Sequence, residues 1–97
     1  RADQTTKVRG MFVHAKHVDA IAKRFPEVLR ARLVVSGEMA SDAMALHIEV
    51  QASPDGLANR VADVIRDVTK LRGDVVLVAP GSLPNDGKVI EDARSYR

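Results

Sequence analysis

The sequence predicts a small α+β sandwich, in which helices cover one face of a mixed or antiparallel sheet. Segments with apolar residues at every second position alternate with segments whose apolar residues recur every three to four positions. The chain has 97 residues, which is enough for one domain with a single core. The expected order of elements is strand, helix, strand, strand, helix, strand and helix. This order fits a ferredoxin-like arrangement.

The first part of the chain is expected to form a strand, a helix and a second strand. Residues 7–13 alternate enough for a short strand that pairs locally as a hairpin. A helix follows from Lys16, because four apolar residues share one face at helical spacing: Val18, Ile21, Ala22 and Phe25. Pro26 ends this helix. Residues 31–35 suggest the next strand, and turn signals over 37–43 let the chain reverse.

The clearest strand covers residues 44–51, where apolar and polar side chains alternate. The apolar face consists of Met44, Leu46, Ile48 and Val50. We expect the polar face of this strand to meet water. A second helix is then expected from Ser53 as its cap and Pro54 at its first position, with Gly73 as its stop.

The last part is expected to contain a short strand over 75–79, a loop over 80–87 and a terminal helix over 89–96. Lys88 stands directly after a run of Pro, Asn, Asp and Gly, residues that favour stiff, tight turns. Its ammonium group would therefore project from a fixed point. A fixed cation suits negative charge that develops during a reaction.

Composition excludes several classes of function. The formal net charge of +2 is too small to build a strong field for nucleic acid, and three aromatic residues provide no stacking platform. We therefore expect no nucleic-acid partner. No apolar stretch approaches the length of a membrane span, so no membrane partner is expected. Cysteine is absent, which removes disulfides and thiolate sites and fits a cytoplasmic protein.

The three histidines do not predict a site. His14 and His17 are three residues apart and could face one ligand, but the sequence marks no third ligand, so we predict no metal. His47 lies on the polar side of its strand and is interpreted as a surface residue. No serine in a nucleophile elbow accompanies it.

Three segments, in order, resemble the C-terminal domain of the acyl-adenylate-forming ligases, most closely the phenylacetate-coenzyme A ligase branch. They are Arg1-Ala2-Asp3, Lys7-Val8-Arg9-Gly10 and Leu83-Pro84-Asn85-Asp86-Gly87-Lys88. The resemblance spans the whole chain. It implies one lid domain over residues 1–97, with an interdomain hinge region over residues 1–6. The large N-terminal adenylation domain of the same polypeptide, absent from this sequence, would be its partner.

The resemblance also implies an activity and the residues that serve it. These ligases convert a carboxylic acid, ATP and coenzyme A into acyl-coenzyme A, AMP and pyrophosphate. Lys88 matches the lysine that reaches the acid and the α-phosphate during adenylation, and Asp3 matches the hinge residue. Arg1 matches an arginine that touches the nucleotide. The segment Lys7, Val8, Arg9 and Gly10 matches the strand that lines the pantetheine tunnel.

Further expectations follow from the same resemblance. ATP and coenzyme A would be substrates of the intact enzyme, with Mg held outside this domain, and this domain alone would hold no cofactor and be inactive. The acid is a small-molecule carboxylic acid that the sequence does not specify, because its pocket lies in the large domain. Isolated copies could self-associate as a homo-oligomer. The alternative is a free-standing ferredoxin-like regulatory module that senses a small molecule and in which Lys88 has no role.

Overall fold

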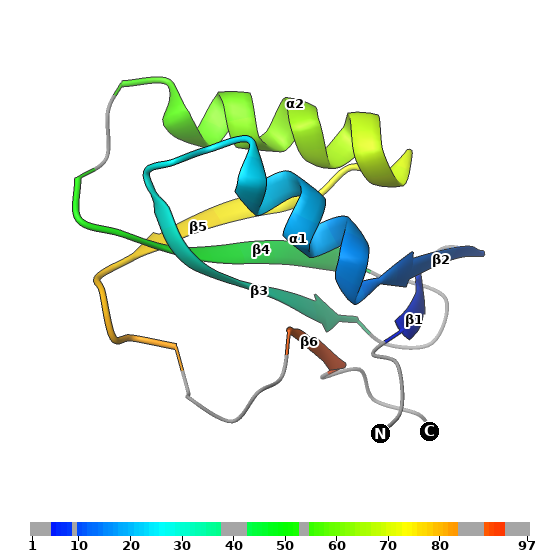
Figure 1. Cartoon of the computed structure of the whole chain (residues 1–97). Coiled ribbons are helices and arrows are strands. Elements are labelled where there is room, and N and C mark those ends of the chain that lie inside the picture. The colour runs from blue at the N-terminus through cyan, green and yellow to red at the C-terminus, as the bar shows by residue number, and fades with distance from the viewer. Residues whose placement is uncertain (1–4, 9, 38–42, 53–54, 84–88, 93–97) are drawn as a thin grey trace.

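The computed structural model describes residues 5–8, 10–37, 43–52, 55–83 and 89–92. Within these ranges, two helices lie on one face of a four-stranded sheet, and a separate two-stranded hairpin lies beside that sheet (Figure 1). The predicted fold class, α+β with a mixed sheet and helices on one face, is confirmed. Neither helix in the described part of the chain is long and apolar enough to cross a membrane.

The sheet is built around an antiparallel pair of strands, β3 (Val28–Ser36) and β4 (Ala43–Val50). β5 (Asp74–Val78) is parallel to β4, and β6 (Ile90–Asp92) is parallel to β3, so the strand order is β5-β4-β3-β6. The expected ferredoxin-like arrangement contains split βαβ units, in which a third strand lies between the two parallel strands. In this sheet the parallel strands β4 and β5 are instead direct neighbours.

The hairpin consists of β1 (Thr5–Val8) and β2 (Met11–His14), which pair antiparallel with Val8 opposite Met11. The segment over residues 7–13, where the sequence predicts one short strand with local hairpin pairing, therefore contributes to both strands of a hairpin. The side chains of Val8 and Val13 are 1% and 0% exposed. These two valines attach the hairpin to the core.

The helices α1 (Ala15–Lys23) and α2 (Leu57–Thr69) close the core against the sheet. Their buried apolar faces meet the inward-facing side of β3 and β4. The fully buried residues include Val18, Val35, Leu46, Ile48, Leu57, Val61 and Ile65. Burying each such side chain contributes about 1.5–3 kcal/mol relative to leaving it exposed. The predicted apolar stripe of α1 is confirmed at Val18 and Ile21, and Phe25 is buried just beyond the end of the helix.

His14 and His17 contact each other at the start of α1. The backbone N–H of His14 donates to Nδ1 of His17 at 2.9 Å, so this contact needs His17 with an unprotonated Nδ1. Burial lowers the pKa of His17, and the neighbouring His14 and Lys16 lower it further. The neutral form that the contact requires is therefore favoured.

The start of α2 differs from the prediction. The helix begins at Leu57, after Gly56 at a φ of +81°, and not at the expected Ser53 and Pro54, which lie outside the described residues. Glycine adopts a positive φ without steric cost. The turn at Gly56 therefore sets the start of the helix.

The end of α2 also differs from the prediction. The helix ends at Thr69, and Lys70, not Gly73, takes the left-handed cap conformation with a φ of +65°. Gly73 has a different role, because a Cβ there would lie 3.2 Å from Cγ2 of Ile65 and 3.3 Å from Cε of Met44. The absent side chain lets the start of β5 approach the core.

The terminal helix expected over residues 89–96 is wrong for the residues that the structure describes there. Val89 accepts a hydrogen bond from the N–H of Leu33 at 2.8 Å, and β6 pairs with β3 from Ile90 onward. An unpaired edge of β3 would leave backbone groups without partners. Pairing with that edge therefore overrides the local preference for helix, and residues 93–97 lie outside the described part.

We predict that Lys70→Gly stabilises the protein by about 1 kcal/mol, because glycine removes the steric cost of a side chain at a positive φ. Urea unfolding measures the difference. Arg24→Gly is the matched control, since Arg24 caps α1 at a φ of −79° and gives glycine no such advantage. Equal effects at the two positions would contradict the explanation.

Candidate functional site

The residues that the sequence singled out fall into two groups. Arg1, Asp3, Arg9 and Lys88 lie outside the described residues. Lys7, Val8 and Gly10 lie in the hairpin. The structure therefore defines the hairpin itself and the two segments that flank the lysine loop, residues 84–88.

Each hairpin residue has a definite environment. Val8 has its side chain in the core, so its backbone is the part that can face a ligand. Gly10 has a φ of +85°, and among the described residues other than its chain neighbours no heavy atom lies within 4 Å of the position that a Cβ would take. The turn conformation explains this glycine, because nothing in the described part crowds it.

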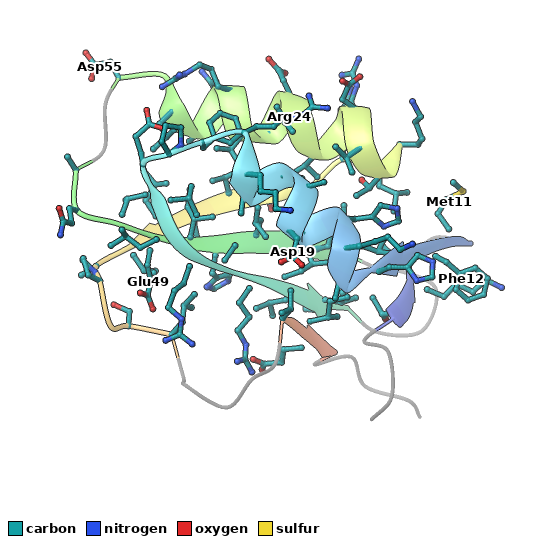
Figure 2. All side chains as sticks on the ribbon, in the orientation of Figure 1. Met11, Phe12, Asp19, Arg24, Glu49 and Asp55 are labelled. Atoms are coloured by element: carbon teal, nitrogen blue, oxygen red, sulfur yellow. The ribbon has the colours of Figure 1, made fainter. Side chains whose placement is uncertain are left out.

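The hairpin also exposes apolar side chains. Met11 and Phe12 are 43% and 59% exposed and project from β2 (Figure 2). Nζ of Lys7 lies 5.6 Å from the ring centroid of Phe12, its partner across the hairpin. A cation over an aromatic ring at this distance is attracted to the face of the ring. One face of the hairpin therefore presents the Phe12 ring with the Lys7 ammonium beside it, and Met11 lies on the opposite face.

The face of the sheet opposite the helices is the second feature, and it carries polar residues that the sequence analysis expected to meet water. That expectation is wrong for Glu49 on β4, which is only 2% exposed. Arg32 on the neighbouring strand β3 is also buried, with 5% exposure. Charged residues are almost never fully buried unless they are paired. We call this side the outer face and define it by Arg30, Arg32, His47 and Glu49, which pair across β3 and β4.

Glu49 is bonded to the segment that follows β5. Its Oε1 accepts the backbone N–H of Gly81 at 3.0 Å, and its Oε2 accepts the N–H of Leu83 at 2.9 Å. Figure 2 shows Glu49 on the outer face, next to this segment. Arg30 adds an ion pair at 4.0 Å. One carboxylate thus holds two backbone donors on a segment more than 30 residues further along the chain.

These contacts favour the ionised form of Glu49. The N–H groups of Gly81 and Leu83 lower the pKa of the carboxyl group, Arg30 lowers it further, and burial opposes them. The net direction is downward. Hydrogen bonds from backbone N–H groups stabilise a carboxylate in this way.

A second attachment lies after the lysine loop. Arg32 Nη2 lies 2.9 Å from Oε1 of Glu91, and its Nε donates to the same oxygen at 3.0 Å. Leu33 donates its N–H to the carbonyl of Val89 at 2.8 Å. β1 also contacts β6, which places the hairpin beside the strand that follows the loop. Both flanks of residues 84–88 are therefore bonded to the same sheet.

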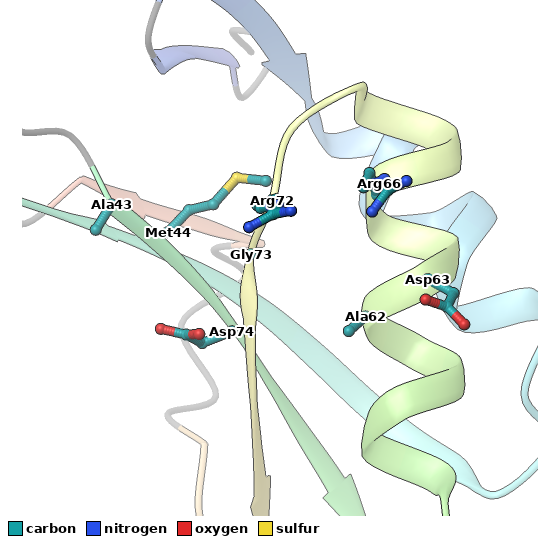
Figure 3. A pocket seen from close by; sticks show the side chains of 8 residues that line it. All are labelled: Ala43, Met44, Ala62, Asp63, Arg66, Arg72, Gly73 and Asp74. Atoms are coloured by element: carbon teal, nitrogen blue, oxygen red, sulfur yellow. The ribbon is translucent and has the colours of Figure 1, made fainter.

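The open hollow in Figure 3 does not involve these segments. It lies between α2 and the start of β5, and its charged lining residues are Asp63, Arg66, Arg72 and Asp74. The two acidic and two basic groups offset one another. The hollow contains none of the residues that the sequence singled out.

A metal site receives no support from the geometry. Over the described ranges, no group of three or more His, Cys, Asp or Glu side chains could hold a metal ion. The rings of His14 and His17 lie 5.3 Å apart, but Nδ1 of His17 accepts the His14 N–H. These two residues serve the start of α1.

Sequence reasoning missed Glu49. A signal was present, because two arginines at alternating positions in the preceding strand mark a charged face across from it. Whether that face meets water depends on where residues 79–83 run, which no local pattern encodes.

We predict that Glu49→Gln lowers the unfolding free energy at neutral pH and that the difference from wild type shrinks in acid. The carboxylate's contribution is complete above the ordinary glutamate pKa of about 4.3 and is lost as pH falls through the lower folded-state pKa. Thermal unfolding from neutral to acid pH measures it. A difference that stays constant with pH would contradict the role assigned to the ionised group.

Comparison with solved structures identifies the same fold in ligase domains. A domain of phenylacetate-coenzyme A ligase from Bacteroides vulgatus ATCC 8482 gives a TM-score of 0.84 at 18% identity, over 98% of this chain and 97% of that chain. A 2-hydroxyisobutyryl-CoA ligase in complex with 2-HIB-AMP and CoA, in the thioesterification state, gives 0.81 at 24% identity over 98% of this chain. No family model and no curated protein matches the sequence.

The length of the match has a consequence for function. This chain covers 22% of the 2-hydroxyisobutyryl-CoA ligase in that state, and 21% of the same ligase in the postadenylation state with R3-HIB-AMP, where the TM-score is 0.74 at 20% identity. The chain thus spans about a fifth of that enzyme's length. At these identities the comparisons establish the fold.

Proposed function

We propose that this chain is the mobile C-terminal lid of an ATP-dependent acyl- or aryl-coenzyme A ligase. The observation that carries the proposal is a near-complete match, 98% of this chain against 97% of a phenylacetate-coenzyme A ligase domain, at a TM-score of 0.84. Fold similarity alone does not give function. Additional support comes from the three sequence segments and from the anchoring of both flanks of the lysine loop.

The reaction has two steps. First, a carboxylate oxygen of the acid attacks the α-phosphorus of ATP, the bond from that phosphorus to the bridging oxygen breaks, and pyrophosphate leaves. Second, the thiol sulfur of coenzyme A attacks the acyl carbon, the bond from that carbon to the AMP oxygen breaks, and AMP leaves while the thiol proton passes to solvent. The structure of 2-hydroxyisobutyryl-CoA ligase with 2-HIB-AMP and CoA, in the thioesterification state, corresponds to the second step in that enzyme.

Lys88 would serve the first step. Its ammonium group would stabilise the negative charge that builds on the phosphate oxygens as the carboxylate attacks. Such a group acts best when its position is set before the reaction, because no reorganisation is then needed. The hydrogen bonds of Leu83 and Val89, on either side of residues 84–88, support this proposal.

The hairpin and the hinge would serve the second step. Asp3 would absorb the backbone rotation that swings the lid between steps, since hinges are a few residues that take up large dihedral changes. The turned lid would then present Lys7, Val8, Arg9 and Gly10 to the pantetheine of coenzyme A. The exposed Phe12 supports this proposal, because it offers an aromatic surface on the same face of the hairpin as Lys7.

The partners follow from the same proposal. The large domain of the same polypeptide would hold the acid and most of the nucleotide, with Mg accompanying ATP there, and Arg1 would touch the nucleotide from the lid. The acid is a small carboxylic acid whose identity the large domain sets. The expected homo-oligomer of the isolated lid and its cytoplasmic location remain predictions.

We predict that Lys88→Ala in the full-length ligase slows adenylation by about 100- to 1,000-fold, as for the loss of one preorganised donor. Thioester formation from supplied acyl-AMP should stay near the wild-type rate. Acid-dependent pyrophosphate release measures the first step, and acyl-coenzyme A formation measures the second. Lys23→Ala, which removes a lysine from the last turn of α1, is the matched control and should change neither rate.

Equal losses in both steps would contradict the role of Lys88. A full-length product that releases no pyrophosphate with any of a panel of aromatic and aliphatic acids would contradict the ligase proposal itself. That second result would favour the small-molecule-sensing module.

A further inference from the structure

Residues on both sides of the lysine loop are bonded to the sheet, one to the outer face and one to the edge of β3. Before the loop, Leu83 donates its N–H to Glu49 at 2.9 Å. After the loop, the carbonyl of Val89 accepts the N–H of Leu33 at 2.8 Å. Five residues, 84–88, separate these two anchored positions. Fixed ends close together in sequence restrict how far the chain between them can move.

We infer that Glu49 is a positioning residue for adenylation, acting through the Gly81 and Leu83 backbone to hold the loop that carries Lys88. The inference rests on the proposed function, because it assigns Glu49 a role in the step that Lys88 would serve. Glu49 itself touches neither substrate nor nucleotide in this assignment. Its carboxylate binds the chain five residues before the lysine.

Three observations separate this role from an ordinary salt bridge. Glu49 is almost fully buried, although it faces away from the core side of β4. Its two oxygens are each used by a different backbone N–H of one short segment. Its ion pair with Arg30 is long, at 4.0 Å, so the backbone contacts dominate. The carboxylate is therefore built to hold a loop.

The upstream contact has a downstream counterpart on the same face. Arg32 binds Glu91 at 2.9 Å, and Glu91 follows the loop by three positions. Arg30 and Arg32 both come from β3, so the two carboxylates are tied to neighbouring positions on one strand. This arrangement ties Leu83 and Glu91, on either side of residues 84–88, to the same sheet.

Glutamine at position 49 keeps the shape of the side chain but loses one acceptor. Its carbonyl oxygen can accept one of the two backbone N–H groups. Its NH₂ group is a donor, so it cannot accept the other N–H. One of the two loop contacts is therefore lost. A misplacement of about 1 Å in a catalytic group can cost about 100-fold in rate.

The test is a double-mutant cycle in the full-length ligase, read separately for the two steps. Glu49→Gln should slow adenylation by about 10- to 100-fold, leave thioester formation from supplied acyl-AMP near wild type, and change kcat more than the KM for ATP. In the Lys88→Ala background the same substitution should cost less than about twofold, because there is no lysine left to position. Glu49→Asp, which keeps both acceptors, should recover part of the rate.

A matched control tests for a general effect of lost charge or stability. Glu27 forms an ion pair with Arg60 of α2 at 3.8 Å, so Glu27→Gln removes the same charge without touching the segment after β5. Adenylation should be unchanged in this variant. Assays are run well below the melting temperature of the least stable variant, which thermal unfolding establishes.

The outcomes separate the inference from the proposed function. If Lys88→Ala slows adenylation but Glu49→Gln does not, the positioning role of Glu49 is wrong and the lid proposal stands. If Glu49→Gln costs the same with and without Lys88, or slows both steps equally, Glu49 acts on the fold and the inference is overturned. If Lys88→Ala leaves adenylation unchanged, the proposed function of the lysine fails first.

Discussion

The carboxylate of Glu49 and the two backbone N–H groups that it accepts are the contact on which the rest of the arrangement depends. The contact joins β4, in the centre of the sheet, to residues 79–83, which have few other described attachments of this kind. A buried carboxylate is costly unless its oxygens are bonded. Because an unpaired buried carboxylate would be unfavourable, burial favours the conformation in which Glu49 accepts the N–H groups of Gly81 and Leu83.

The fold explains why one residue can hold this position. β3 and β4 form the antiparallel centre, and each carries apolar residues toward the helices and charged residues toward the outer face. β5 and β6 add to opposite edges, so the chain from β5 must return past the outer face to reach β6 (Figure 1). Gly81 and Leu83 before the lysine loop, and Val89 after it, are bonded to the sheet. The strand pairing of β6 with β3 and the ion pair of Arg32 with Glu91 thus hold the same part of the chain.

Local sequence patterns were sufficient for elements whose signals are also local. The helix before Pro26, the alternating strand that ends at Val50 and the local hairpin expected over residues 7–13 follow from spacing and backbone preference. The strand β6 could not be predicted from local patterns, because a strand at Ile90 forms only by pairing with the edge of β3. The burial of Glu49 could not be predicted either, since it depends on residues 79–83, which lie about 30 positions further along the chain. The roles of Lys88 and Asp3 remain predictions from resemblance.

Amide hydrogen exchange at Gly81 and Leu83 tests the central claim most directly. If Glu49 accepts both N–H groups, both amides are protected in the wild-type chain at neutral pH, and at least one loses its protection in Glu49→Gln. The amides of β3 and β4 should stay protected in that variant. Unprotected amides at both positions in the wild type would contradict the account.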